Sequence, residues 1–379
     1  MRTDAITPLH PTFGVEVHDV DLRQVGPGPA FDGLRALFEE HSLLLFREQH
    51  LDDQAHLAFG ALWGPIEDRS AGATGDAPHL DNVTNRLADG TVAAADSLET
   101  LDLSGNQRWH TDSIFLAVPA LANILAARVL SSTGGETELV STRAAWRDLP
   151  EPLRHRVRNS VFRHRLAHSR VGISDELVAR HRSRFPDQCW RALWPNPVNG
   201  TEALYLASHT CGIEGVDGVE AAAIIDELIA FCTTPDRVYT HQWRPGDVLV
   251  WDERATLHRG RPWPYHEERT LASICISATA SDGLELVRPD PVRVRTHPGL
   301  CRGWGECHRW APDTFVLDAD GHVDVHLVEV PAEEAARAWL AVTACPEQAI
   351  TYLGSPPDPR FADVVRRRSD TAEVGADPS

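Results

Sequence analysis

Short apolar runs bounded by turn residues recur along the first 285 residues of the chain. Two of them, Leu43–Phe46 and Asp247–Trp251, are almost continuously hydrophobic, which is typical of strands. Turn-forming pairs bound such runs at Gly134-Gly135, Asn199-Gly200 and Pro245-Gly246. The pattern therefore predicts a series of short strands joined by tight turns.

Apolar residues at helical spacing occur between these runs. They predict helices at about 31–41, 51–62 and 218–232. Many short strands with few helices favour a mainly β fold with flanking helices, in the form of a sandwich or a jelly roll (a double-stranded β-helix).

The pattern changes near Pro289-Asp-Pro291, where we expect a linker. From Ser355 onward the chain is polar and aperiodic, which is typical of a mobile tail. We therefore expect a first domain over residues 1–286, a second over 287–354 and a tail over 355–379.

Composition narrows the class of protein. The 379 residues include 42% hydrophobic residues and 11 Trp, enough for a sizeable core. The formal net charge of −19 argues against a nucleic-acid partner. No apolar stretch reaches the roughly 18 residues of a membrane span, and Met1–Pro8 lacks the apolar core of a signal peptide. We expect a cytoplasmic protein without a membrane partner.

In that compartment the seven cysteines should be thiols or metal ligands, not disulfides. Four of them have no ligand-like spacing and are expected to be small buried hydrophobic residues: Cys189, Cys211, Cys232 and Cys275.

The triplet His110-Thr111-Asp112 suggests a first metal site. On a strand, residues i and i+2 point to the same face, so the imidazole and the carboxylate could occupy adjacent positions on one ion. A second His from a distant strand would complete the two-His, one-carboxylate arrangement of non-haem Fe(II) oxygenases. Alone the triplet is a weak signal, because such His residues are often only hydrogen-bonded.

Context singles out His258, which follows the apolar strand Val248–Trp251. Arg269 lies eleven positions further on and could bind a carboxylate through two parallel hydrogen bonds. A 2-oxo acid that chelates iron and has a distal carboxylate would need such a partner.

With these motifs in order, the first zone resembles the TauD/TfdA family of Fe(II)- and 2-oxoglutarate-dependent dioxygenases. It is most similar to the branch that includes the 2,4-dichlorophenoxyacetate and taurine enzymes. The stretches that carry the resemblance are Ile6–Leu9, Leu43–Arg47, Asn106–Phe115, Gly134–Leu139, Trp243–Asp247 and Trp251-Asp252, followed by His258 and Arg269.

The resemblance implies that His110, Asp112 and His258 bind Fe(II), and that Arg269 and Thr137 bind the distal carboxylate of 2-oxoglutarate. It implies a small-molecule substrate and O₂ as reactants. The presence of Asp112 favours hydroxylation, desaturation or ring formation over halogenation, because related halogenases have a small residue there.

The chain departs from its relatives at Ser273. Family members that act on small acids commonly have a second Arg four residues after the co-substrate Arg, and Ser273 cannot balance an anionic group. We therefore expect that neither taurine nor 2,4-dichlorophenoxyacetate is the main substrate. Asn106, His168 and His209 occupy positions of substrate-pocket residues in the family, and core or supporting roles remain open for all three.

A second redox centre is indicated near the C-terminus. Cys301 and Cys307 bracket Arg-Gly-Trp-Gly-Glu, and Cys345-Pro346 follows later. Bacterial ferredoxins use Cys-x₂-Cys-x₂-Cys with a distant Cys-Pro, and Trp304 stands here at the middle position. Three thiolates suit a [3Fe–4S] cluster. A [4Fe–4S] cluster with a ligand other than Cys is the alternative.

Residues 290–353 resemble the single-cluster ferredoxins that serve bacterial cytochromes P450, which implies a small α+β ferredoxin-like domain. A structural zinc site, with His308 as the fourth ligand, is the competing interpretation. The Ala311-Pro312 and Cys345–Ile350 flanks favour the iron–sulfur cluster.

The role of the cluster stays open, because a 2-oxoglutarate dioxygenase needs no external electron donor. The cluster could return Fe(III) to Fe(II) after uncoupled turnover, supply an electron to an unusual oxidation, or serve only as a docking module. A redox-sensing binding protein on a dioxygenase scaffold is the alternative function. A ferredoxin reductase and a second copy of the chain are expected partners.

Overall fold

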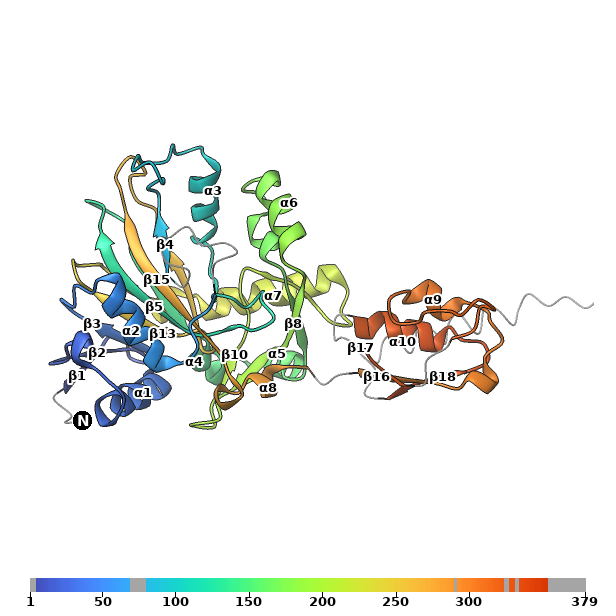
Figure 1. Cartoon of the computed structure of the whole chain (residues 1–379). Helices are drawn as coiled ribbons and strands as arrows, with labels where there is room; N and C mark the ends of the chain where they lie inside the picture. The colour runs from blue at the N-terminus through green and yellow to red at the C-terminus, as the bar shows by residue number, and fades with distance from the viewer. Residues whose placement is uncertain (1–4, 69–79, 290–291, 324–326, 331–333, 354–379) are drawn as a thin grey trace, which may run out of the picture.

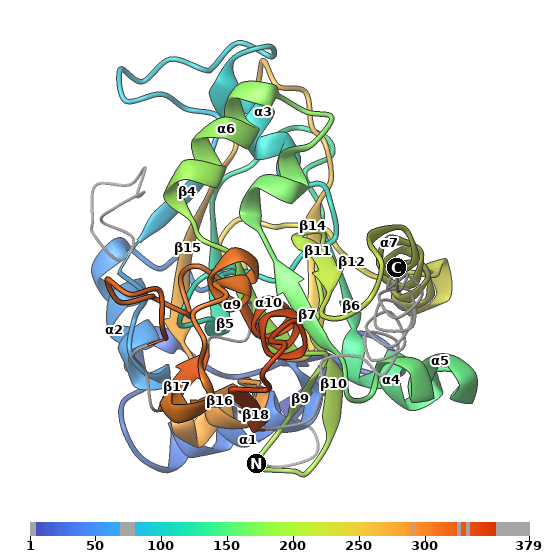
Figure 2. The ribbon, with the colours of Figure 1, turned by 90° about the vertical axis from the view of Figure 1, so that its right-hand side faces the viewer.

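Two bodies, each with its own hydrophobic core, follow one another along the chain (Figure 1). The computed structural model describes residues 5–68, 80–289, 292–323, 327–330 and 334–353. Figure 2 views the molecule from the side of the smaller, C-terminal body. The tail expected over 355–379 lies outside the described residues.

A seven-stranded sheet forms the centre of the larger body, in the order β1-β2-β3-β13-β5-β15-β4. All neighbouring strands are antiparallel except β2 and β3. The strands are β1 (Ile6–Pro8), β2 (Val15–Val17), β3 (Leu43–Phe46), β13 (Val248–Asp252), β5 (Ala120–Val129), β15 (Thr270–Ser277) and β4 (Asp81–Thr84). Strands β3 and β13 coincide with the two apolar runs of the sequence.

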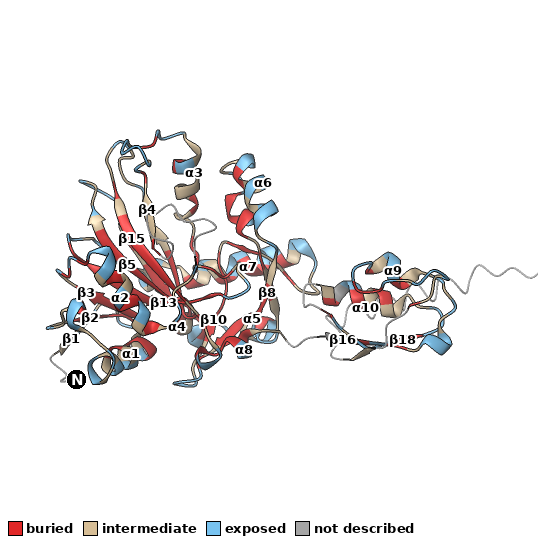
Figure 3. Cartoon of the chain, viewed as in Figure 1, coloured by how far each residue is buried: buried red, intermediate tan, exposed pale blue. Residues whose placement is uncertain are grey.

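Strand β13 shows why these runs are continuously apolar. Side chains alternate between the two faces of a strand. Val248 and Val250 pack into the core beneath helices α1 (Pro29–His41) and α2 (Asp53–Trp63), whereas Leu249 and Trp251 pack against a second sheet. Both faces of the sheet are covered, so every position of the strand is buried (Figure 3).

The second sheet has the order β12-β6-β14 and lies against the inner face of the first. Its strands are β12 (Tyr239–His241), β6 (Thr137–Ser141) and β14 (Thr256–Gly260). Two further small sheets complete the body, with strands β7 (Val161–His164), β8 (Gln188–Arg191), β11 (Thr210–Ile213), β9 (Leu193–Pro195) and β10 (Glu202–Leu204). Two facing antiparallel sheets form the expected jelly roll.

Helices surround the roll, and three of them match the helical patterns of the sequence: α1, α2 and α7 (Gly218–Cys232). The other helices are α3 (Leu98–Gly105), α4 (Thr142–Asp148), α5 (Glu151–Val157), α6 (Asp175–Arg184) and α8 (Leu284–Val287). Single 3₁₀ turns occur at η2 (Leu22–Gln24), η3 (Leu166–Arg170), η4 (Pro235–Arg237) and η5 (Ala280–Asp282).

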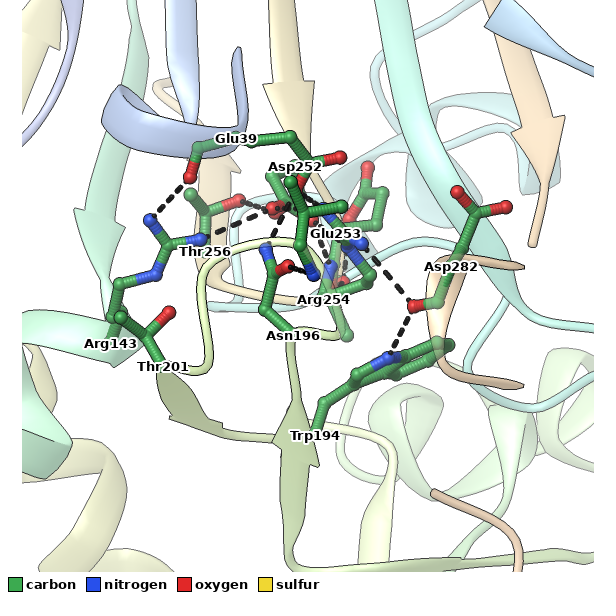
Figure 4. Close-up of polar contacts among 12 residues, drawn as sticks. Glu39, Arg143, Trp194, Asn196, Thr201, Asp252, Glu253, Arg254, Thr256 and Asp282 are labelled. Atoms are coloured by element: carbon green, nitrogen blue, oxygen red, sulfur yellow. Dashed lines mark hydrogen bonds and ion pairs between the residues drawn. The ribbon is translucent and has the colours of Figure 1, made fainter. Parts of the chain in front are cut away.

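A buried ionic network fixes the turn between β13 and β14 (Figure 4). Arg254, which is 2% exposed, donates from Nε to Asp252 Oδ1 at 2.8 Å and from one terminal nitrogen to Glu39 Oε2 at 2.7 Å. Its other terminal nitrogen donates to the carbonyl of Asp282 at 3.2 Å. These bonds join the turn to α1 and η5, and buried charges in such a paired network resist displacement.

The smaller body is a three-stranded antiparallel sheet, ordered β17-β16-β18, with two helices on one side. Its elements are β16 (Val292–Thr296), η6 (Pro298–Leu300), α9 (Glu306–Trp310), β17 (Leu327–Val330), α10 (Ala335–Thr343) and β18 (Ile350–Leu353). Val294, Phe315, Ala338 and Ile350 belong to a core separate from that of the larger body. This is the small α+β unit expected from the sequence.

Candidate active site and cluster site

Three side chains that are far apart in the sequence meet inside the jelly roll. Ligand atoms of His110, Asp112 and His258 all lie within 4.8 Å of one another. The Nε2 atoms of His110 and His258 are 3.7 and 3.8 Å from the carboxylate oxygens of Asp112. The donor set of two imidazoles and one carboxylate suits Fe(II).

The backbone places these residues differently from the expectation of one regular strand. His110 forms an isolated antiparallel bridge with His258 of β14, with N–H···O bonds of 2.9 and 2.8 Å in the two directions. Asp112 begins the turn that follows, and Ser113 has a positive φ of 57°. The bridge sets the two imidazoles side by side, and the turn brings the carboxylate to them.

Hydrogen bonding prepares His110 for a metal. Its Nδ1 lies 2.7 Å from the carbonyl of Arg108, which can only accept, so the proton resides on Nδ1 and the Nε2 lone pair is free. Burial lowers the pKa of His110, and it lowers the pKa of His258 to about 3. Both rings are therefore neutral near pH 7, the form that binds metals.

The carboxylate of Asp112 is oriented by a chain of side chains across the main sheet. Asn123 of β5 donates from Nδ2 to Asp112 Oδ2 at 2.6 Å. Ser273 of β15 donates from Oγ to Asn123 Oδ1 at 3.1 Å. Ser273, notable in the sequence for the missing Arg, thus supports a candidate iron ligand through Asn123.

Glu253 is a buried residue beside the candidate iron ligands that the sequence analysis missed. Its side chain is fully buried and accepts hydrogen bonds from Thr111 Oγ1 at 2.6 Å, the Asp112 N–H at 2.9 Å and Trp251 Nε1 at 2.7 Å. Burial, followed by the charge of Asp112, raises its pKa well above the usual value. Oε2 lies 3.9 Å from His258 Nδ1, a buried nitrogen without a hydrogen-bond partner in the described part of the chain.

Arg269, the expected partner of a ligand carboxylate, is a buried cation of the larger body. Arg269 is 4% exposed and forms no ion pair with a carboxylate among the described residues. One terminal nitrogen donates to the carbonyl of Gly135 at 2.6 Å, and the guanidinium carbon lies 4.9 Å from the centre of the Trp263 ring. Burial lowers the pKa of Arg269 to about 10, so the group remains charged at neutral pH. A buried cation of this kind fits a carboxylate ligand.

Gly135 contacts Arg269, and Thr137 follows two residues later at the start of β6. Gly135 has a φ of +73°, and a Cβ added there would lie 2.6 Å from Arg269 Nε, so only glycine fits. Thr137 is buried and accepts a hydrogen bond from Trp243 Nε1 at 3.1 Å, which leaves its hydroxyl proton available to a ligand.

The three proposed substrate residues lie in different environments. His209 is buried, with its ring centre 6.0 Å from that of His110. Asn106 is half-buried, and its carbonyl accepts from the N–H of Gly260, two residues beyond His258. His168 is exposed on η3 and is not among the buried residues around the metal ligands.

Arg170 is a second residue that the sequence analysis missed. It is buried, and its charge contributes to lowering the pKa of both His110 and His209. Its Nε donates to Asp102 Oδ1 at 2.6 Å. Gly105 packs on the guanidinium so closely that a Cβ would lie 2.3 Å from it. A buried cation beside the metal ligands depends on this tertiary contact, and no sequence motif marks it.

In the smaller body, Cys301, Cys307 and Cys345 line a solvent-connected cavity together with Trp304. Cysteine thiolates are the usual ligands of iron–sulfur clusters, and three of them line one cavity here.

The residues beside this cavity agree with that interpretation. Trp304 is 65% exposed and donates from Nε1 to Glu347 Oε1 at 3.3 Å, and an indole has no lone pair for iron. His308, the alternative fourth zinc ligand, contacts the Phe315 carbonyl through Nδ1 at 2.8 Å and does not line the cavity. The Ala349 N–H donates to Cys345 Sγ at 3.4 Å.

The remaining cysteines behave as the sequence predicts. Cys189, Cys232 and Cys275 are buried and Cys211 is half-buried, and none of the four forms a disulfide with another described residue. Burial raises the pKa of Cys232 to about 12, which keeps this thiol protonated. No helix in the described part of the chain is long and apolar enough to cross a membrane.

The jelly roll and its two-His, one-carboxylate trio define a non-haem iron oxygenase, and comparison with known proteins gives the family. A family model described as "Taurine catabolism dioxygenase TauD, TfdA family" matches residues 5–275, and one described as "4Fe-4S single cluster domain" matches residues 296–352. The chain belongs to the TauD/TfdA family, as the sequence motifs indicated, and it is a 2-oxoglutarate-dependent dioxygenase with an appended iron–sulfur domain.

Individual relatives support this assignment. The 2,4-dichlorophenoxyacetate dioxygenase of Cupriavidus pinatubonensis (strain JMP 134 / LMG 1197) is 31% identical over 270 residues, covering 70% of this chain and 94% of that protein. The (S)-phenoxypropionate/alpha-ketoglutarate-dioxygenase of Delftia acidovorans is 33% identical, covering 70% and 92%. The crystal structure of AAD-2 with Mn(II) and N-oxalylglycine is 31% identical, with a TM-score of 0.67 over 73% of this chain and 98% of that one.

Proposed function

We propose that this dioxygenase hydroxylates, desaturates or cyclises a small molecule, and that its iron–sulfur domain supplies electrons that keep the active-site iron as Fe(II). The observation that carries the proposal is the coexistence in one chain of a buried His110–Asp112–His258 trio and a separate cavity lined by three cysteines. The first fits a catalytic iron, and the second fits an electron-transfer cluster.

In the proposed active site, His110, Asp112 and His258 hold Fe(II). The iron, with 2-oxoglutarate and O₂, supplies the chemistry that oxidises a substrate C–H bond and releases succinate and CO₂. Arg269 and Thr137 bind the distal carboxylate of 2-oxoglutarate: the guanidinium balances its charge, and the hydroxyl donates a hydrogen bond. The buried surroundings strengthen both contacts.

The substrate is proposed to be larger or less anionic than taurine or 2,4-dichlorophenoxyacetate. Ser273 lies in the roll bonded to Asn123 and offers no positive charge. Asn106, His168 and His209 are the proposed substrate contacts. Steady-state turnover of taurine or 2,4-dichlorophenoxyacetate at a rate rivalling the best substrate in a screen would contradict this proposal.

The cluster is proposed to be [3Fe–4S], bound by Cys301, Cys307 and Cys345, with [4Fe–4S] and a non-cysteine fourth ligand as the alternative. Three cysteine ligands and the indole of Trp304 at the fourth position support the three-iron form. Iron and sulfide analysis with EPR on anaerobically purified protein distinguishes the two. An EPR-silent oxidised cluster with four irons would exclude the three-iron form.

We assign the dioxygenase domain to residues 1–286, the cluster domain to 287–354 and a tail to 355–379. Thiolate ligation needs reduced cysteines, which supports a cytoplasmic location. A ferredoxin reductase is the proposed donor to the cluster, and assembly into a homo-oligomer is part of the proposal.

A redox-sensing binding protein is the second candidate function, favoured by the redox cluster itself. The buried, carboxylate-free Arg269 argues against it, because a sensor has no need of a 2-oxoglutarate pocket. Fe(II)- and 2-oxoglutarate-dependent succinate release supports the enzyme. If the pure, iron-loaded protein releases no succinate while its cluster cycles reversibly, the sensor is the better account.

A further inference from the structure

Helix α6 carries positive charge that its own domain leaves uncompensated. Residues 151–191 hold ten arginines and four acidic residues, in a chain whose formal net charge is −19. Three of these arginines, Arg180, Arg182 and Arg184, are exposed on α6. None of the three forms an ion pair with a residue that the structure describes. We call these three side chains the arginine face.

The dioxygenase domain buries little of this helix. Leu177 is the only fully buried residue of α6. His181 contacts Asp102 Oδ1 at 3.3 Å, which holds the helix against α3. Arg180 and Arg184 are one turn apart and repel each other. A helix this polar, without internal ion pairs, is typical of one that bridges to another domain.

The cluster domain has a surface of opposite character around its cavity. Trp304 lines the cavity and is 65% exposed, and Leu300, directly before Cys301, is 52% exposed. Glu306 and Glu347 line the cavity, and Asp320 is exposed beside it. We call these five residues the cluster mouth; an aromatic centre with a charged rim is typical of protein interfaces.

The charge balance of the two surfaces is complementary. Residues 287–354 hold ten acidic residues and six arginines, and the three cysteine thiolates add negative charge when a cluster is bound. Arg302 is an exposed cation on the cavity wall, so the mouth is acidic but not uniformly so. Complementary charge of this kind orients two surfaces as they meet.

We propose that the arginine face of α6 is the docking site for the cluster mouth of the same chain. Both figures show α6 on the side of the jelly roll that faces the cluster domain (Figures 1 and 2). Beneath α6, Asp102 contacts both His181 and the buried Arg170, whose charge acts on His110. Docking here would bring the cluster close to the iron ligands. The docking proposal depends on the proposed electron supply only for the function that docking would serve.

Zero-length crosslinking of the full chain tests the docking. The chain contains no lysine, so Arg182→Lys introduces a single side-chain amine and keeps the positive charge. A carbodiimide joins that amine to a carboxylate in direct contact, with loss of water to the reagent. Arg244→Lys, on the turn before β13, is the matched control, because Arg244 is exposed and forms no ion pair with another described residue. Mixing ¹⁵N-labelled and unlabelled chains separates crosslinks within a chain from those between chains.

The expected product joins residue 182 to Glu306, Asp320 or Glu347 within one chain. Its yield should exceed that of the control several-fold and fall in 1 M salt, where the screening length drops from about 10 to about 3 Å. A yield equal to the control, or mixed-isotope products, would overturn the proposal. The variant Arg180→Glu/Arg182→Glu/Arg184→Glu gives a second test. The proposal is also overturned if this variant raises the KM for 2-oxoglutarate while its small-angle scattering depends on salt in the same way as that of the wild type. Crosslinking is scored without turnover, so it can succeed even if electron supply fails.

Discussion

Replacing Glu253 by glutamine removes one hydrogen-bond acceptor from beneath the candidate iron ligands. The glutamine carbonyl can still accept from Thr111 and from the Asp112 N–H, but its NH₂ group then faces the indole N–H of Trp251. One unsatisfied buried donor costs about 1–3 kcal/mol of folding free energy. Loss of a residue that orients metal ligands typically lowers metal affinity about 10- to 100-fold. We therefore expect the apo-protein to lose about 1–3 kcal/mol and Fe(II) to bind 10- to 100-fold more weakly.

Two measurements on the same variant separate these effects. Urea unfolding of the apo-protein reports the stability, and anaerobic titration calorimetry with Fe(II) reports the dissociation constant. Glu39→Gln is the matched control, because Glu39 is buried in the Arg254 network away from the trio and also accepts several hydrogen bonds. It should be destabilised without any change in Fe(II) affinity. If Glu253→Gln binds Fe(II) as tightly as the wild type, Glu253 does not position the ligands.

Three further outcomes are expected. Gly135→Ala should abolish measurable 2-oxoglutarate binding in calorimetry while Fe(II) still binds, because the added Cβ would lie 2.6 Å from Arg269 Nε. Unchanged 2-oxoglutarate binding would contradict the assignment of Arg269 to this ligand. Trp304→Cys should raise the iron content from three to four per cluster and change the EPR spectrum; an unchanged spectrum would place the fourth position elsewhere. Burial lowers the pKa of His56 and His164 to about 3 in the folded chain. As the pH falls through about 6.5, these histidines therefore become protonated in the unfolded chain but stay neutral in the folded one. Stability is full above that pH and should fall by about 1 kcal/mol per histidine between pH 7 and 5.5, with a smaller loss in His164→Gln.

Much of the fold could be predicted from local pattern. Strand β13 is apolar at successive positions because both of its faces are covered. This produces a continuous hydrophobic run that is visible in the sequence. Helices α1, α2 and α7 instead follow apolar periodicity because each is buried on one side.

The site was only partly predictable, for physical reasons. His110 and Asp112 form a local motif, but their geometry comes from a bridge to His258 and a turn, not from a regular strand. Glu253 and Arg170 act through contacts with residues distant in the sequence, so single-residue patterns do not reveal them. Local sequence encodes ligand types, whereas the packing of the roll determines their supporting residues.

The most direct test of the electron supply is the number of turnovers that the enzyme completes without ascorbate. Succinate is counted until activity stops, with a reductase or dithionite as donor, in the wild type and in Cys301→Ser/Cys345→Ser. The account predicts that the folded variant stops after several-fold fewer turnovers and that added ascorbate restores them. Equal turnover numbers and equal ratios of product to inactivation in the two proteins would contradict the role of the cluster in keeping the iron reduced.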